Sequence, residues 1–144
     1  MGSGQASRPF KTAPYLPEIQ WDQPVAMVRI PDSATKLVVE RFGTLWLLHP
    51  EERIKEPFLS LLGKGAPPSG SGTPRLTLNA IFHNRFPAEP YLYLLSNEGN
   101  NASGINRLSR FEVTFSGDRL QVSPDSERVL LSWCAKGHRG GGLA

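Results

Sequence analysis

A chain of 144 residues allows one ordinary domain with a modest core. Its apolar content of 39% is low to ordinary, and its 14 glycines and 13 prolines supply too many turn residues for a helical protein. The net charge of +3 comes from 16 basic and 13 acidic residues that are spread along the chain. Because no cluster of Lys and Arg interleaved with aromatic residues occurs, we expect no nucleic-acid partner.

The sequence gives no signal for an intrachain disulfide, a metal site, a membrane span or a signal peptide. Cys134 is the only cysteine, which excludes an intrachain disulfide, and no Cys/His spacing typical of a metal site occurs. No apolar stretch approaches the roughly 20 residues of a membrane span. The N-terminal segment MGSGQASRPFKTAP lacks the apolar region of a signal peptide. We therefore expect no membrane span in this chain and assign no metal ligand from the residue pattern.

The first segment, residues 1–24, is rich in proline and has little periodicity. This composition predicts an extended lead-in before the first regular element. Phe10, Tyr15, Ile19 and Trp21 are available to pack against the rest of the protein. A flexible tail is the alternative interpretation.

From residue 25 to residue 62 the pattern becomes regular, with short apolar runs separated by turn residues. Gly43 links two of these runs and indicates a hairpin. The charged segment 50–56 could start a helix at Pro50, but it is too short for more than about one turn. The expected strands are 24–30, 36–42, 44–49 and 57–62.

Residues 63–75, GKGAPPSGSGTPR, have no apolar periodicity and are predicted to be a loop. A second set of apolar runs follows within residues 76–133, again bounded by Asn, Gly, Pro, Asp or Ser. Its expected strands are 76–83, 91–96, 107–115 and 128–133. Directly afterwards, residues 138–144 read HRGGGLA, which is typical of a turn that enters another strand.

The pattern as a whole predicts an all-β protein with about two four-stranded antiparallel blades and the start of a third. Repeated four-stranded units of this kind are the signature of a β-propeller, and a β-sandwich is the alternative. Each unit is self-contained and the last residues begin another, which favours the propeller. We thus expect a partial propeller over residues 25–144. Its predicted parts are a blade at 25–62, a loop at 63–75, a blade at 76–133 and the start of the next blade at 138–144.

Four stretches in this order carry a resemblance to a known family. They are Arg8-Pro9-Phe10 with WDQPVAMVRIPDSATKLVVERFGTLWLL, then LTLNAIFHNRFPAEPYLYLL, then NRLSRFEVTF with SPDSERVLLSW, and finally GHRGGGLA. Together they resemble the N-terminal part of the glucose/sorbosone dehydrogenase family, which comprises quinoprotein sugar dehydrogenases on a six-bladed propeller. The similarity covers the chain from about residue 20 and about a third of the family's propeller. Because two blades leave apolar faces open, we expect this chain to be a fragment of a longer protein.

The resemblance implies a function and a site. It implies an oxidoreductase that uses PQQ and calcium, acts on a sugar or alcohol, passes electrons to an acceptor and works in the periplasm or outside the cell. His138 stands at the matching position of the His-x-Gly-Gly turn, where the family has a general base that takes the proton of the substrate hydroxyl. An imidazole suits this role because its pKa lies near the operating pH. The resemblance assigns no cofactor-binding residue in this chain, because the family's cofactor and calcium ligands lie in later blades.

Other observations favour less specific roles. His138 could merely fix a blade turn, His83 could fix the hairpin that follows it, and His49, before a proline, fits a surface turn. The segment 70–75 lacks the family's glutamine, and Arg85 replaces the aspartate of its proline-aspartate turn. These departures favour an alternative function, a non-catalytic propeller segment that serves as a scaffold or interaction module.

Overall fold

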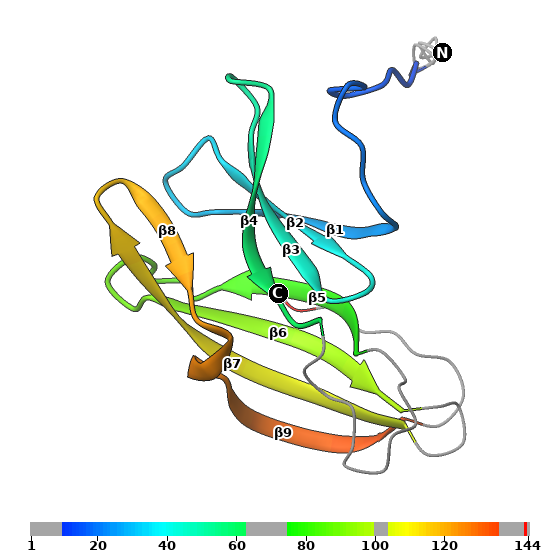
Figure 1. Ribbon diagram of the computed structural model, residues 1–144, viewed down its shortest axis with the longest axis vertical. Coiled ribbons are helices and arrows are strands. Elements are labelled where there is room, and N and C mark those ends of the chain that lie inside the picture. The colour runs from blue at the N-terminus through cyan, green and yellow to red at the C-terminus, as the bar shows by residue number, and fades with distance from the viewer. Residues whose placement is uncertain (1–9, 63–74, 100–103, 136–142, 144) are drawn as a thin grey trace, which may run out of the picture.

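The computed structural model describes residues 10–62, 75–99, 104–135 and 143. These residues form two antiparallel sheets that pack face to face (Figure 1). The predicted all-β class is confirmed, and so is the division into two consecutive sheets. The predicted start of a third blade at 138–144 lies outside the described residues, apart from Leu143, which belongs to no element.

The first sheet has the strand order β1-β2-β3-β4. The four strands correspond to the four apolar runs that predicted them, and successive side chains of a strand point to opposite faces of the sheet. Gly43 connects β2 to β3 with a φ angle of +92°, a conformation that glycine adopts without steric strain. The bounds are β1, Pro24–Arg29; β2, Lys36–Glu40; β3, Thr44–His49; and β4, Ile54–Ser60.

The second sheet has the order β5-β6-β7-β8, with β9 paired along β7. The pairing divides β7 in two: its first half pairs with β9 and its last residues pair with β8. The strands β5, β6, β7 and β9 therefore form the predicted four-stranded blade, and β8 is an addition. The bounds are β5, Leu76–Phe82; β6, Tyr91–Glu98; β7, Gly104–Ser116; β8, Arg119–Val122; and β9, Arg128–Ala135, with a short 3-10 turn at Pro124–Ser126.

Three details differ from the sequence-based expectation. The chain makes a turn at 50–53 and β4 begins at Ile54, so the second half of the charged segment is strand. Both β6 and β7 extend farther than their apolar runs. The strand β8 was missed because it holds only two apolar residues; both Leu120 and Val122 pack against the core. A turn at Gly117, with φ at +60°, brings β8 back onto β7.

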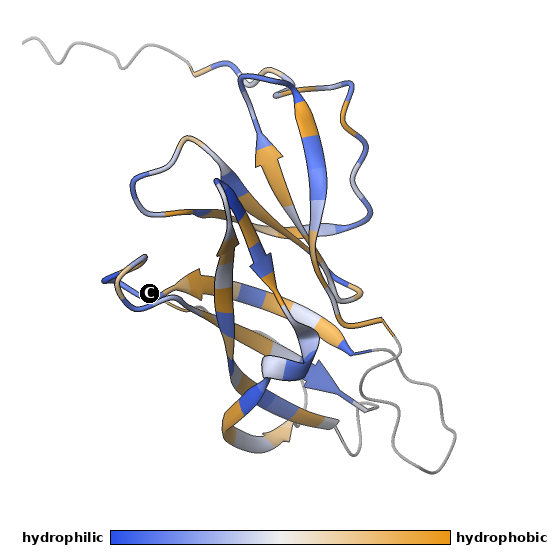
Figure 2. Ribbon diagram, turned by 60° about the vertical axis from the view of Figure 1, so that its left-hand side comes forward, coloured by the Kyte–Doolittle hydropathy of each residue, from blue (hydrophilic) through white to orange (hydrophobic). Residues whose placement is uncertain are grey.

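The main hydrophobic core lies between the two sheets. Apolar residues follow the strands in alternation with polar ones, as the colours of Figure 2 show. The first strands of the two sheets, β1 and β5, lie next to each other, which is the arrangement of inner strands in neighbouring propeller blades. The core comprises Ile30, Leu37, Val39, Leu45, Leu47, Phe58, Leu59, Leu61, Ala80, Phe82, Phe86, Leu92, Leu94, Phe111 and Val113.

The lead-in, residues 10–23, runs over the face of the first sheet that points away from the second sheet (Figure 1). Ile19 and Trp21 pack there, as the sequence suggested, whereas Phe10 and Tyr15 are exposed. Leu16, which the sequence did not single out, is the buried anchor of this contact. Within the part of the chain that the structure describes, no helix is long and apolar enough to cross a membrane.

Candidate functional site

One end of the second sheet adjoins two segments that the sequence connected with function, because 70–75 directly precedes β5 and His138 follows β9. Leu76 begins β5 at this end, Asn97 pairs with it from β6, Asn106 follows on β7, and Trp133 closes the row on β9, two residues before that strand ends at Ala135. We call this row across the ends of the strands the Leu76 edge. His138 is the third residue after Ala135 in the sequence, and it lies outside the described residues.

Two hydrogen bonds from Thr77 join the second sheet to the end of β2 beside the Leu76 edge, and a third bond connects that end of β2 to the lead-in. The amide of Arg41 donates to the carbonyl of Gln23 at 3.0 Å, and the amide of Thr77 donates to the carbonyl of Arg41 at 2.8 Å. The Thr77 hydroxyl also donates to the carbonyl of Glu40. Because these bonds connect the residue before β1 and the end of β2 to the start of β5, the first residues of both inner strands are held close to each other.

Gly43, in the β2–β3 turn, lies close to Leu61 and to the backbone of Arg75. A Cβ atom on Gly43 would lie 3.3 Å from the Cβ of Leu61 and 3.5 Å from the carbonyl oxygen of Arg75. The β2–β3 turn thus packs on Leu61 and on the backbone that enters β5, and a side chain at this turn would be strained by the positive φ angle and crowded by Leu61.

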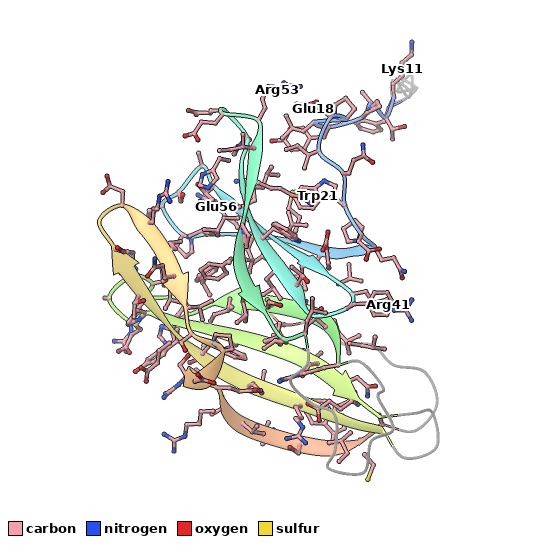
Figure 3. The ribbon with its side chains drawn as sticks, viewed as in Figure 1. Lys11, Glu18, Trp21, Arg41, Arg53 and Glu56 are labelled. Carbon is pink, nitrogen blue, oxygen red and sulfur yellow. The ribbon has the colours of Figure 1, made fainter. Side chains whose placement is uncertain are left out.

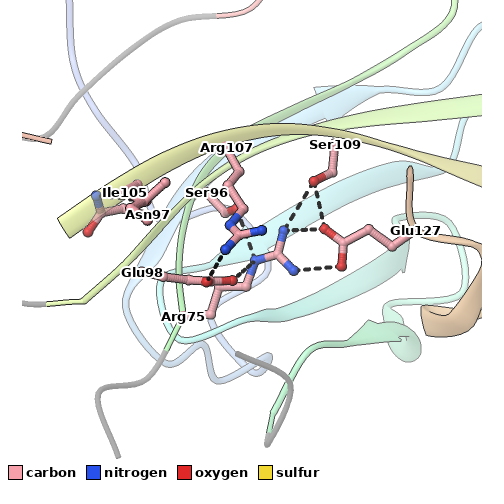
Figure 4. A network of polar contacts seen from close by, with 8 residues as sticks. All are labelled: Arg75, Ser96, Asn97, Glu98, Ile105, Arg107, Ser109 and Glu127. Atoms are coloured by element: carbon pink, nitrogen blue, oxygen red, sulfur yellow. Dashed lines mark hydrogen bonds and ion pairs between the residues drawn. The ribbon is translucent and has the colours of Figure 1, made fainter. Parts of the chain in front are cut away.

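Arg75 crosses the inner face of the second sheet from the start of β5 to the segment before β9 (Figure 4). Its Nη2 and Nη1 atoms donate to the two carboxylate oxygens of Glu127 at 2.6 and 2.8 Å. Where the side chain crosses β6 and β7, Nε donates to Ser96 Oγ at 3.0 Å and Nη2 donates to Ser109 Oγ at 3.3 Å. Only 3% of the Arg75 side chain is exposed. A bidentate, buried ion pair of this kind is a strong charge-assisted contact.

Glu98 and Arg107 extend the network. A carboxylate oxygen of Glu98 lies 3.5 Å from Arg75 Nε, and its other oxygen lies 3.1 Å from Arg107 Nη2. Burial by itself would raise the pKa of Glu127, but the hydrogen bonds from Arg75 and Ser109, with the charges of Arg75 and Arg107, lower that pKa overall. Glu127 is therefore held as a carboxylate, and the Arg75 guanidinium is fully engaged by it.

Two described residues at or next to the Leu76 edge, Asn97 and Arg107, have a buried polar atom without a hydrogen-bond partner. For Asn97, Nδ2 donates to Asn106 Oδ1 at 2.9 Å and Oδ1 has no partner; for Arg107 the atom is Nε. A single amide oxygen is far from the roughly six to eight oxygens that Ca²⁺ takes. Nor do the described residues include a group of three or more His, Cys, Asp or Glu side chains that could hold a metal ion.

The described residues do not fit a quinone cofactor or its calcium. A quinone with carboxylates needs cations that are free to bind it, and two arginines at the Leu76 edge are paired with carboxylates, Arg75 with Glu127 and Arg107 with Glu98.

The structure describes two of the three histidines. His83 follows β5 at the end opposite the Leu76 edge, and its Nδ1 accepts a hydrogen bond from the amide of Arg85 at 3.2 Å. Its ring also lies near those of Tyr91 and Tyr93. His83 therefore fixes the hairpin, as the simpler interpretation held.

His49 is more constrained than its place before a proline suggested. It is the last residue of β3, and its Nδ1 lies 3.3 Å from Thr35 Oγ1 while its Nε2 lies 3.2 Å from Glu56 Oε1. It also faces a hollow between the sheets. Sequence reasoning missed this position because the partners come from two other strands or turns, and only the register of β3 with β4 brings Glu56 into reach.

Comparison with known proteins gives a consistent result for the fold. No protein-family model and no curated protein sequence matches the chain. Among solved structures, the chain is similar to a protein of Thermus thermophilus designated an oxidoreductase (glucose dehydrogenase), with 25% identity and a TM-score of 0.52 over 78% of this chain and 29% of that one.

Two aldose sugar dehydrogenases match in the same way. The PQQ-bound enzyme of Streptomyces coelicolor gives 18% identity and a TM-score of 0.58 over 82% of this chain and 32% of that one. The soluble enzyme of Escherichia coli, in its apo form, gives 19% identity and a TM-score of 0.56 over 83% and 32%. The resemblance to sugar dehydrogenases is thereby confirmed at the level of the fold. The chain spans about a third of the length of the solved structures it matches.

Proposed function

We propose that this chain supplies two consecutive blades of a sugar-dehydrogenase-type propeller, and that the completed ring oxidises a sugar or another alcohol. The observation that supports this most is the match of both sheets, in order, to part of several sugar dehydrogenases. A ring needs more blades than two, since each blade covers the apolar face of its neighbour. The chain alone is therefore expected to be inactive.

His138 is our candidate for the general base of that reaction. Oxidation of an alcohol to a carbonyl requires a group that takes the hydroxyl proton, and an imidazole can accept and release a proton near neutral pH. Two facts support the assignment: the sequence match of the His-x-Gly-Gly turn, and the end of β9 at Ala135, which lies at the same end of the second sheet as the start of the inner strand β5, with β6 and β7 between them. By the same resemblance, we expect the complete protein in the periplasm or outside the cell.

A second candidate function is a cofactor-free propeller that serves as a scaffold or interaction module. A specific observation favours it: Arg75, at the place where the sequence lacks the family's glutamine, is buried and paired with Glu127. In this alternative the segment before β5 stabilises the second blade and contacts no cofactor.

Dye reduction in the presence of added PQQ, calcium and a panel of aldoses separates the two functions. The complete protein is compared with its His138→Ala variant and with His83→Asn, a matched control at the hairpin opposite the Leu76 edge. We expect His138→Ala to lose about 10²–10⁴-fold in turnover, the range for a positioned base, and His83→Asn to keep it. Equal turnover in the wild type and His138→Ala would contradict the role of His138. No turnover in any of them, with intact folding, would favour the scaffold.

A further inference from the structure

A hollow opens between the two sheets at the end opposite the Leu76 edge. Its volume is about 540 Å³, within the roughly 300–1,000 Å³ of small-molecule sites. Four connections line it: the β1–β2 turn, the β3–β4 turn, the β5–β6 connection at Phe86-Pro87 and the β7–β8 hairpin. The hollow lies away from the residues discussed above for catalysis, so it is independent of the proposed function.

One wall of the hollow is aromatic. The rings of Phe86 and Phe115 are stacked with their centroids 5.8 Å apart, and Phe86 also meets Phe82 edge-on at 4.9 Å. Phe86 is thereby fixed in the core, while Phe115, which it supports, is 51% exposed. A large aromatic side chain held on one face and open on the other is a platform for an apolar or cationic group.

The rest of the lining is largely polar and anionic. His49 is held between Thr35 and Glu56, and Glu56, a residue of β4 labelled in Figure 3, lines the hollow with it. The carboxylates that line the hollow come from the β1–β2 turn, the β3–β4 turn, β4 and the β7–β8 hairpin, which also carries Phe115, whereas one guanidinium lines it among the described residues. The carboxylates are those of Asp32, Glu52, Glu56 and Asp118, and the guanidinium is that of Arg119.

These features together select a class of ligand. The excess of carboxylates repels phosphates and carboxylic acids and attracts a cation. The exposed face of Phe115 favours an apolar or aromatic body next to that cation, because aromatic rings bind both through their faces. We propose that the hollow binds a small organic amine that carries an apolar body, with its ammonium group toward the carboxylates and its body on Phe115.

Titration calorimetry of the 144-residue chain tests this with three probes of one shape. They are 2-phenylethylamine, which is cationic, 2-phenylethanol, which is neutral, and phenylacetate, which is anionic. We expect saturable binding of the amine that weakens as the salt concentration rises, because salt screens charges. We expect at least about tenfold weaker binding of the alcohol and none of the anion, since the amine gains attraction from several carboxylates at about 1 kcal/mol or less each. Absent amine binding, or equal binding of amine and alcohol, would overturn the proposal.

Two pairs of variants locate the site. Glu52→Gln and Glu51→Gln change the same charge in adjacent exposed residues of one turn, but only Glu52 lines the hollow. We expect Glu52→Gln to weaken amine binding about three- to fivefold, the value of one nearby charge in water, and Glu51→Gln to leave it unchanged. Phe115→Leu should weaken it further, whereas Phe10→Leu, at an exposed residue of the lead-in, should not. Equal effects within both pairs would mean that the amine binds elsewhere and would overturn the assignment.

Discussion

The two sheets share a strand pattern but differ in how their outward faces are covered. On the outward face of the first sheet, Val38 and Leu48 are 2% and 1% exposed, because the lead-in covers them. On the outward face of the second sheet, Leu131 and Trp133 are 60% and 44% exposed. In a propeller both faces are covered by neighbouring blades. Among the described residues, the lead-in therefore covers the outward face of the first sheet, and no segment covers Leu131 and Trp133 on the outward face of the second.

The cover of the first sheet is specific rather than a loose apolar contact. The ammonium of Lys55, from β4, lies 4.6 Å from the centroid of the Trp21 ring and 4.2 Å from that of Trp46. Glu40 accepts hydrogen bonds from Trp46 Nε1 at 2.8 Å and from the amide of Asp22 at 2.7 Å. A cation between two aromatic rings, beside a buried carboxylate, ties the lead-in to the sheet at a defined register.

The second sheet is secured from its inner face instead. Arg75 reaches across β6 and β7 to Glu127, so one side chain links the start of β5 to the segment before β9. The comparison teaches that the first sheet depends on a segment outside it and the second on a buried ion pair within it. Mutations should therefore affect the two sheets through different contacts.

The largest effect is expected from Arg75→Met. Removing one partner of a buried ion pair leaves an uncompensated charge and costs about 3–5 kcal/mol; because the Glu127 carboxylate keeps some contact with solvent, we expect the lower end of that range. Urea unfolding measures the loss. The control Arg85→Met removes an exposed pair with Glu89 and should cost under about 1 kcal/mol. Equal losses would show that the Arg75 network does not stabilise the second sheet.

The next effect concerns the lead-in. Trp21→Ala removes one ring of the Lys55 contact and part of the apolar cluster around Leu16, for an expected loss of about 2 kcal/mol. The freed lead-in should also be cut faster by a protease. Tyr15→Ala, an exposed position of the same segment, is the matched control and should change neither measurement. Unchanged protease cutting of Trp21→Ala would mean that Trp21 does not anchor the lead-in.

The sequence predicted the features that depend on neighbouring residues and missed those that depend on residues far apart in the chain. The apolar runs PVAMVRI and KLVVERF and the turn residues between them predicted β1 and β2 within two residues, since such runs and turns are local signals. The strand β8 was missed because RLQV has too few apolar residues to stand out, and it exists only because β7 continues past its other partners.

The sequence did not predict the polar contacts, for a different reason. Arg75 and Glu127 are 52 positions apart and, as charged residues, are expected at the surface. Their contact follows from the order and register of β5, β6, β7 and β9, which no local pattern gives. The hollow at His49 is likewise assembled from four connections. The role of His138 stays a prediction, because that residue lies outside the described part of the chain.

A smaller effect is the response of the Arg75 network to acid. Because the folded-state pKa of Glu127 is lowered, its ionised form stabilises the fold above the unfolded-state pKa of about 4.3, and that stability is lost as the pH falls through the lower folded-state pKa. The difference in unfolding free energy between the wild type and Glu127→Gln should be constant near neutral pH and shrink below about pH 4. A difference that is independent of pH would contradict the ion pair.

The smallest effect on stability, and the most direct test of the comparison, comes from the two outward faces. Leu131→Lys changes an exposed residue on the open face of the second sheet, and Met27→Lys changes an exposed residue beside the covered part of the first.

Exposed apolar faces and unpaired sheet edges associate with other chains, so we expect the wild-type chain to self-associate. Sedimentation velocity should show that Leu131→Lys shifts the chain toward monomer while Met27→Lys has little effect, because the lead-in already covers much of that face. Both variants should unfold within about 0.5 kcal/mol of the wild type, as is usual for surface substitutions. Equal effects on association would mean that the lead-in does not cover the outward face of the first sheet, and a monomeric wild type would show that the outward face of the second sheet does not drive self-association.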